Sequence, residues 1–186
     1  MPIAYIGLGA NLPSSAGQPE TTLAAAAKCL AEFGPIVSRS SLYSTEPVGF
    51  ADQPRFLNAV VALDTSRQPR QLLDALLATE HEFGRDRSLG VANGPRTLDL
   101  DILLYGNLIL SEPGLEIPHP RLAQRAFVLI PLGEIAPDAV EPRSGRAVSQ
   151  LLQSLIPHPE DKTHAVVKIQ SDVWPDGGDP VGLDLA

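Results

Sequence analysis

The chain has 186 residues, of which 44% are hydrophobic and 19% are charged, a balance typical of one folded globular domain. Its formal net charge of −8 at pH 7 excludes long-range attraction to nucleic acids or anionic membranes. The sequence holds one cysteine and no apolar run near the ~20 residues that span a bilayer. We therefore expect a cytoplasmic protein without disulfides, nucleic-acid partners or membrane contacts, and a monomer rather than an oligomer.

Hydrophobic periodicity predicts alternating strands and helices over the first 105 residues. Proline in the first turn and glycine after the last turn mark two helices, and apolar runs between turn residues mark the strands. The expected elements are, in order, a strand at 3–8, a helix at 19–33, strands at 36–45 and 56–63, a helix at 69–83 and a strand at 98–105. This order predicts an α+β, ferredoxin-like fold, with helices packed on one face of an antiparallel sheet.

Residues 1–157 are expected to form a single domain, with short added helices at 125–135 and 148–156. Residues 158–186 would form a C-terminal extension that is partly disordered. From residue 171 onward the extension contains four Asp, three Gly, two Pro and no Lys or Arg, so we expect a solvated tail there.

Two common nucleotide-binding motifs are absent from the sequence. Gly7-Leu8-Gly9 follows the first strand, but Leu12 stands where a dinucleotide fingerprint needs glycine. No Gly-x-x-x-x-Gly-Lys-Ser/Thr segment occurs, which excludes a P-loop. A bound phosphate would need other positive groups, for which ordinary surface arginines are the alternative interpretation. The arginines grouped in the middle of the chain are Arg85, Arg87, Arg96, Arg121 and Arg125.

Asp99 and Asp101 alternate with apolar residues in the strand expected at 98–105. A strand places both carboxylates on one face, with Cα atoms about 6.6 Å apart, so both can reach one cation or a close pair of cations. Hard oxygen ligands favour magnesium, which normally keeps waters and phosphate oxygens in its shell. The alternative is the solvated outer face of an amphipathic strand.

Arg96 follows the rigid Gly94-Pro95 turn and stands just before the two aspartates. The whole segment 93–103, Asn-Gly-Pro-Arg-Thr-Leu-Asp-Leu-Asp-Ile-Leu, resembles the signature of the 6-hydroxymethyl-7,8-dihydropterin pyrophosphokinase family. Further blocks match that family in order, so the resemblance covers about residues 3–157, the predicted catalytic domain. These blocks are Gly7 to Leu12, Tyr43 to Pro47, Asp52 to Pro54, Phe56 to Ala59, Pro118 to Arg121 and Pro131 to Pro137.

The resemblance implies an enzyme of folate biosynthesis that transfers pyrophosphate from ATP to the hydroxymethyl group of the pterin, leaving AMP. It implies that Asp99 and Asp101 bind two magnesium ions with ATP, and that Arg85 and Arg96 orient the phosphates as catalytic groups. Such a transfer needs alignment and charge neutralisation rather than a covalent nucleophile. The residues implied around ATP are Glu80, Arg87, Ile102, His119 and Arg125.

Phe56 and Asn58 share one face of the strand expected at 56–63. Asn is disfavoured among apolar strand neighbours, and a flat heterocycle that stacks on Phe56 and bonds Asn58 would explain both. An aromatic core residue beside a satisfied Asn is the alternative. The resemblance adds Phe127 as a second stacking surface and backbone groups of three residues at the pterin edge, which are Thr45, Glu46 and Val48.

Glu80 lies on the apolar stripe of its helix, so its carboxylate needs hydrogen-bond donors or a route to water.

The chain departs from the family at three positions. Many members carry Tyr where this chain has Phe56, and Ala92 and Asn93 replace a frequently basic residue and a tryptophan. The polar loop from Arg85 to Asn93 lacks a periodic apolar pattern, so we expect it to close only over bound ATP and pterin.

Two other functions remain open from the sequence. The first is a magnesium-dependent transferase that cleaves ATP at another bond, which the products would distinguish. The second is a ferredoxin-like ligand-sensing module, which would bind ligand without turnover and has little use for Arg96, Asp99 and Asp101 together.

Overall fold

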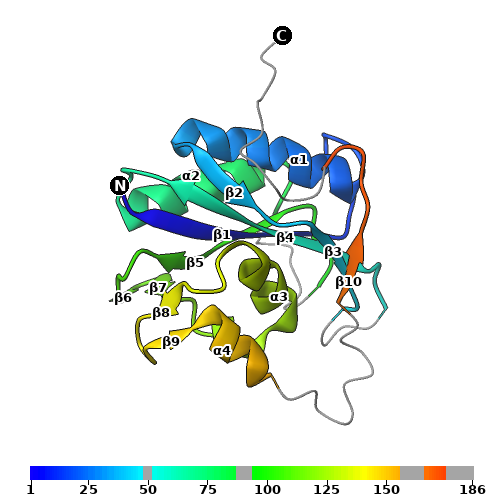
Figure 1. Cartoon of the computed structure of the whole chain (residues 1–186). Coiled ribbons are helices and arrows are strands. Elements are labelled where there is room, and N and C mark those ends of the chain that lie inside the picture. Colours follow the sequence, from blue (N-terminus) through cyan, green and yellow to red (C-terminus); the bar gives the residue numbers. More distant parts are fainter. Residues whose placement is uncertain (48–51, 87–93, 156–165, 175–186) are drawn as a thin grey trace.

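The computed structural model describes residues 1–47, 52–86, 94–155 and 166–174. A six-stranded antiparallel sheet lies between helices on its two faces (Figure 1). Helices α1 (Pro19–Leu30) and α2 (Pro69–Glu82) cover one face, and α3 (Ala126–Ile135) and α4 (Val148–Gln153) lie on the other. None of the helices described is long and apolar enough to cross a membrane.

Strand β1 (Ile3–Ala10) runs antiparallel between β4 (Phe56–Asp64) and β5 (Asp99–Tyr105). On its other edge, β4 pairs with β2 (Ile36–Arg39) and then with β3 (Leu42–Thr45). The sheet order is therefore β10 (Val167–Ile169), β3, β4, β1, β5, with β2 also paired to β4. The remaining short elements are η1 (Ala31–Phe33), β6 (Leu110–Glu112), β7 (Leu115–Ile117), η2 (Leu122–Gln124), β8 (Val140–Glu141), β9 (Arg146–Ala147) and β10 (Val167–Ile169).

Side chains along β1 point alternately to the two faces of the sheet. Its even positions, Ala4 to Ala10, are at most 3% exposed and pack with α1 and α2 in the larger core. The second core forms on the opposite face, where Val60 and Leu103 meet Leu129 of α3. Gly7 and Gly9 of β1 point to this second face and leave space there, because they carry no side chain.

The predicted order of strands and helices is confirmed, including the short helices that follow β5. Two features differ from the prediction. The stretch expected at 36–45 is divided into β2 and β3 by the buried residues Ser40 and Ser41, where Ser40 Oγ accepts a hydrogen bond from the Val60 N–H at 2.9 Å. The added helices cover the second face of the sheet, so helices pack on both faces rather than on one.

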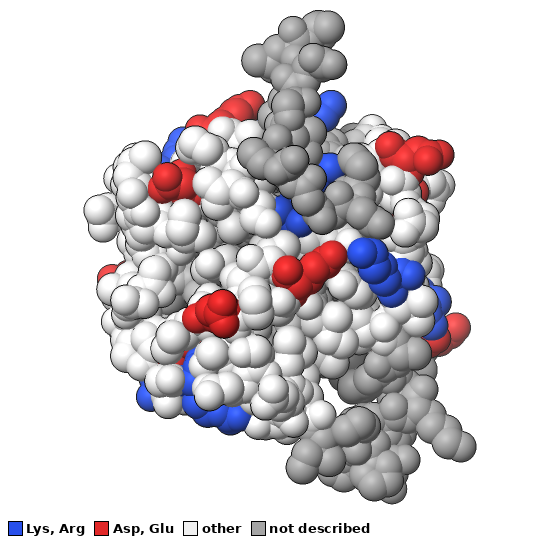
Figure 2. All heavy atoms as spheres, viewed as in Figure 1, with Lys and Arg blue, Asp and Glu red and all other residues white. Residues whose placement is uncertain are grey.

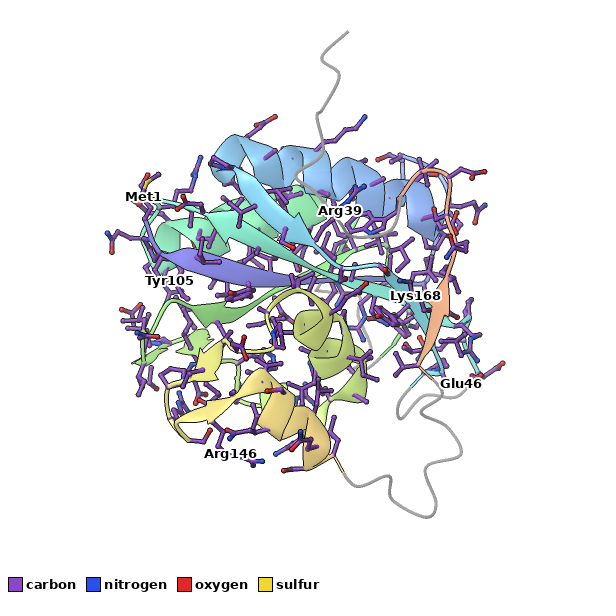
Figure 3. All side chains as sticks on the ribbon, viewed as in Figure 1. Met1, Arg39, Glu46, Tyr105, Arg146 and Lys168 are labelled. Carbon is purple, nitrogen blue, oxygen red and sulfur yellow. The ribbon has the colours of Figure 1, made fainter. Side chains whose placement is uncertain are left out.

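Glu134 of α3 ties that helix to the strands at the sheet edge. Its carboxylate accepts hydrogen bonds from the Ser41 N–H at 2.8 Å, from Ser41 Oγ at 2.6 Å and from the Tyr43 hydroxyl at 3.0 Å. Lys168 of β10 lies 3.5 Å from the same carboxylate. Figure 3 shows Lys168 on the same side of the molecule as Glu46, the residue after β3. The contacts join α3, β3 and β10 into one unit.

The C-terminal segment 166–174 packs on the domain. β10 pairs antiparallel with β3, and Trp174 is 1% exposed, with Nε1 donating to the Ser40 carbonyl at 2.8 Å. The Arg39 guanidinium lies 5.2 Å from the centroid of the indole ring. The predicted solvated tail was therefore wrong at Trp174, because the composition argument weighed charge and glycine but not one large aromatic. Residues 175–186 lie outside the described residues.

Candidate active site

A pocket of about 450 Å³ lies on the sheet face that carries α3. Its lining comes from the C-terminal end of β1, the first residues of β4 and β5, and the segment 119–128 that leads into α3. Figure 2 shows charged side chains scattered among uncharged ones on the face viewed in Figure 1, with neither sign forming a continuous patch there. The arginines that matter to the site instead face the pocket, which Arg85, Arg96, Arg121 and Arg125 line.

Both aspartates of β5 face this pocket, as the alternation predicted. They lie beside the two glycines of β1, since Gly9 pairs with Asp99 and Gly7 with Asp101. A side chain at position 7 or 9 would narrow this space. A Cβ on Gly9 would come 3.3 Å from Asn58 Oδ1. The missing side chains therefore keep the two carboxylates accessible from the pocket.

Positive groups surround the Asp99 carboxylate. Arg96 donates from Nη1 to Asp99 Oδ2 at 2.9 Å, and Arg85 Nη2 lies 3.8 Å from Asp99 Oδ1. Arg85 reaches this position because Gly84, two residues after the end of α2, has a φ of +82° and turns the chain toward the pocket. Asp101 has a different neighbour, His119, whose Nε2 lies 4.0 Å from Asp101 Oδ2.

The surroundings of His119 favour the neutral form of its imidazole. Burial lowers its pKa below the ordinary 6.5, and Arg125 and Arg121 lower it further, against the opposing effect of Asp101. The Arg121 N–H donates to Nδ1 of His119 at 3.1 Å, so in the neutral ring Nε2 carries the hydrogen and points it toward Asp101. Burial and the nearby Arg121 also lower the pKa of the Arg125 guanidinium.

Five of the expected pterin residues, Thr45, Glu46, Phe56, Asn58 and Phe127, line the same pocket. Asn58 is 7% exposed, and its Nδ2 donates to Thr45 Oγ1 at 2.8 Å. The side chains of Phe56 and Asn58 share the pocket face of β4, as predicted, and Phe127 lines the pocket from the first turn of α3. The Arg96 guanidinium lies 5.1 Å from the Phe56 ring centroid and also bonds Asp99, so this arginine lies between the aromatic residue and the carboxylate.

Two predicted ATP residues are placed elsewhere. Glu80 is 1% exposed, and its Oε1 accepts a hydrogen bond from the Leu100 N–H at 2.8 Å, so it supports β5 between the two aspartates. Ile102 is 5% exposed and belongs to the larger core on the far side of the sheet. Among the described residues, neither lines the pocket. Val48 and Arg87, and most of the expected lid with Ala92 and Asn93, lie outside the described residues.

The structure adds pocket residues to which the sequence analysis gave no site role. They are chiefly Gly7, Gly9 and Gln124. Gly7-Leu8-Gly9 was weighed as a dinucleotide fingerprint and as a block shared with the family, and neither interpretation gave the glycines a place in the pocket. The signal missed was the alternation of glycine with buried apolar residues in β1, which indicates a strand whose second face is open.

Asp99 and Asp101 supply only part of the ligand shell that a cation needs. No group of three or more His, Cys, Asp or Glu side chains able to hold a metal occurs within residues 1–47, 52–86, 94–155 and 166–174. Two carboxylates fit magnesium, which completes its shell with waters and phosphate oxygens. The donor set therefore suits a cation that arrives with a phosphate ligand better than a permanent structural metal.

Comparison with known proteins gives consistent matches. A family model described as 7,8-dihydro-6-hydroxymethylpterin-pyrophosphokinase (HPPK) matches residues 5–137. A 2-amino-4-hydroxy-6-hydroxymethyldihydropteridine pyrophosphokinase of Pseudomonas aeruginosa is 49% identical over 148 residues, 80% of this chain and 88% of the relative. The protein of the same description from Haemophilus influenzae is 43% identical over 157 residues, 83% of this chain and 94% of the relative.

Among solved structures, the crystal structure of wild-type Plasmodium falciparum HPPK-DHPS aligns with a TM-score of 0.63. The alignment covers 82% of this chain and 44% of that chain, at 15% sequence identity. At this identity the likeness concerns the fold alone. The segment that carries β10 and Trp174 lies beyond the residues matched by the family model.

Proposed function

The chain belongs to the 7,8-dihydro-6-hydroxymethylpterin-pyrophosphokinase family, and we propose that its pocket binds magnesium-ATP at one end and the pterin at the other. The family activity is transfer of pyrophosphate to hydroxymethyldihydropterin in folate biosynthesis. One observation carries the assignment of the site. Asp99, Asp101 and Arg96 line the same pocket as Phe56 and Asn58, so both substrates can meet there.

Asp99 and Asp101 would hold magnesium through their pocket-facing carboxylates. When bound with ATP, the metal would neutralise charge on the phosphate oxygens. Arg96 and Arg85 already lie against Asp99, which supports their proposed role of binding phosphate beside the metal ligands. Arg85 gives further support, because its Nε is buried without a hydrogen-bond partner among the described residues. A phosphate oxygen would satisfy this donor.

His119 and Arg125 extend the same proposal. Neutral His119 presents its Nε2 hydrogen to the pocket side of Asp101, where it can donate to a carboxylate or phosphate oxygen. Arg125 keeps its charge at neutral pH despite the lowered pKa, because a guanidinium titrates far above that range. Both residues therefore suit an anionic ligand, and neither is required to take up a proton.

The pterin end offers stacking surfaces and hydrogen bonds. One of the two Asn58 N–H groups is used by Thr45, which fixes the carboxamide plane and leaves its other groups for a heterocycle edge. Phe56 and Phe127 supply flat apolar surfaces in the same pocket. An amide held rigidly beside two aromatic rings discriminates a heterocycle by both shape and hydrogen bonding.

The chemical step follows from this alignment. The hydroxymethyl oxygen forms a bond to the β-phosphorus and loses its proton to solvent, while the bond from that phosphorus to the α,β-bridging oxygen breaks and AMP leaves with the bonding electrons. The arginines and aspartates align and neutralise the reacting phosphate, and none of them forms a covalent intermediate.

The type of α+β fold, the oligomeric state and the location in the cell stay proposals. The strand order supports the ferredoxin-like arrangement, while the monomeric state and cytoplasmic location stay predictions.

Phosphorus NMR of ATP, magnesium and hydroxymethyldihydropterin with the protein tests the proposal. We expect AMP and a pterin diphosphate. Release of ADP would indicate a simple kinase, and release of free pyrophosphate would indicate nucleotidyl transfer. Binding of both ligands without turnover would instead support the sensing module.

A further inference from the structure

The C-terminal end of β1 occupies a special place in the site. Because β1 is antiparallel to both β4 and β5, its end lies between the starts of these two strands. Gly9 is paired on one side with Asn58 and on the other with Asp99. The residues that follow Gly9 therefore lie between the segment that leads into β4 and the segment that leads into β5.

Asn11 lies at that point and is 3% exposed. Its Nδ2 donates to Gln53 Oε1 at 3.0 Å and to the Pro54 carbonyl at 2.9 Å. Its Oδ1 accepts a hydrogen bond from the Arg96 N–H at 2.8 Å. One buried carboxamide thus uses both donor hydrogens on the β4 side and its acceptor on the β5 side.

The backbone around Asn11 strengthens the link to Arg96. The N–H groups of Asn11 and Leu12 both donate to the Arg96 carbonyl, at 3.0 and 3.1 Å. Both peptide groups of Arg96 are therefore fixed by the end of β1. From this held backbone the guanidinium reaches Asp99 at 2.9 Å and lies 5.1 Å from the Phe56 ring centroid.

The link to β4 is short and stiff. Pro54 stands two residues before Phe56, and its ring fixes one backbone dihedral of the segment. A hydrogen bond that fixes the Pro54 carbonyl therefore restricts the position of the start of β4, which carries Phe56 and Asn58. Asn11 itself does not line the pocket, so within the described residues it acts on the substrates only through these two segments.

We propose that Asn11 is a positioning residue that sets the placement of Arg96 relative to Phe56 and Asn58, and so the placement of the phosphate relative to the pterin hydroxyl. The inference rests on the proposed function and deepens it. Transfer between two bound substrates depends on alignment, and a displacement of about 1 Å can cost on the order of 10²-fold in rate. Loss of Asn11 should therefore slow transfer more than it weakens the binding of either substrate alone.

The test compares Asn11→Ala with the wild type in three measurements: the single-turnover rate of AMP formation, the Kd for magnesium-ATP alone and the Kd for pterin alone. We expect the rate to fall by about 10- to 100-fold and each Kd to change by less than about 3-fold. Ser14→Ala is the matched control, because it removes the 2.7 Å hydrogen bond between the loop after β1 and Thr22 of α1, and the 3.0 Å bond from the Ala16 N–H, without touching either segment. Its rate should stay at the wild-type value.

A double-mutant cycle shows whether Asn11 acts through Arg96. In an Arg96→Ala background, Asn11→Ala should lower the rate by much less than it does in the wild type. Additive losses would contradict the proposal, as would a folded Asn11→Ala protein with a wild-type transfer rate or with weakened binding of one substrate alone.

If Asn11→Ala does not fold, Gln53→Ala must give the same pattern of a slower rate with both Kd values kept, or the inference fails. A wild-type protein that forms no AMP would defeat the proposed function. Wild-type AMP formation with an unchanged rate in folded Asn11→Ala defeats this inference alone.

Discussion

The buried carboxylate of Glu80 accepts a hydrogen bond of 2.8 Å from the backbone N–H of Leu100, the residue between Asp99 and Asp101. This contact joins α2 to β5 from the face opposite the pocket. It places Glu80 behind the strand that carries the two aspartates, and the contact of Glu80 with ATP stays a prediction.

Glu80→Leu should therefore lower stability by about 1–3 kcal/mol, because it leaves the buried Leu100 N–H without this acceptor. Glu80→Gln keeps an acceptor oxygen of the same length and should cost less. Chemical denaturation of both variants measures the difference. Equal stability of the Leu and Gln variants would show that the hydrogen bond from the Leu100 N–H contributes nothing to stability.

Asp99→Ala and Asp101→Ala should each abolish turnover while the fold survives, because both carboxylates face the pocket and not the core. The two variants should differ in stability. Asp99 pairs with Arg96 and Arg85, so its loss leaves two arginines facing one another and should cost about 1–3 kcal/mol.

Asp99→Asn is the control for shape, since it keeps the side-chain volume while removing the charge. Turnover and thermal melting without magnesium are the measurements. Substantial turnover by folded Asp101→Ala would remove Asp101 from the metal site.

His119 should make stability depend on pH. Its pKa in the folded protein lies below the unfolded value of about 6.5, so its contribution is present above that pH. As the pH falls below about 6.5 toward the folded pKa, the unfolded state binds more protons and this contribution is lost. His119→Gln should remove that part of the loss. Melting curves at pH 7.5 and 5 compare the two proteins, and identical pH dependence would contradict a buried neutral imidazole.

Trp174→Ala should destabilise the protein by about 3–5 kcal/mol, the usual cost of removing a large buried aromatic. The control is Val173→Ala, since Val173 is 48% exposed and its change should be neutral. Since the chain has one tryptophan, its fluorescence reports this site directly. Emission typical of a water-exposed indole in the native protein would show that the C-terminal segment does not dock.

Deletions give a second measure of the same segment. Removing residues 171–186 should lower the melting temperature as Trp174→Ala does. Removing only residues 177–186, which lie outside the described residues, should leave it nearly unchanged.

Local sequence patterns were sufficient to predict the helices and strands and part of the candidate site. Alternation of apolar and polar residues predicted that Asp99 and Asp101 share a face, and the same pattern paired Phe56 with Asn58. Such patterns show which face a side chain occupies but not what it meets across the fold. The contacts of Asn11 with Pro54 and Arg96 join residues 43 and 85 positions apart, and no periodicity indicates them.

The docking of Trp174 was missed for the same reason. Its partner, the Ser40 carbonyl, lies 134 positions earlier in the chain. The acidic, glycine-containing composition around the tryptophan also suggested solvent exposure. A single aromatic in such a segment is the available signal, because a large apolar ring is seldom left in water.

The most direct test of the central claim is the fate of a radioactive label at the β-phosphorus of ATP after incubation with magnesium, hydroxymethyldihydropterin and the protein. The account predicts that the label moves into the pterin product while AMP remains unlabelled, and that Asp101→Ala moves none. Label recovered in ADP or in free pyrophosphate would contradict it.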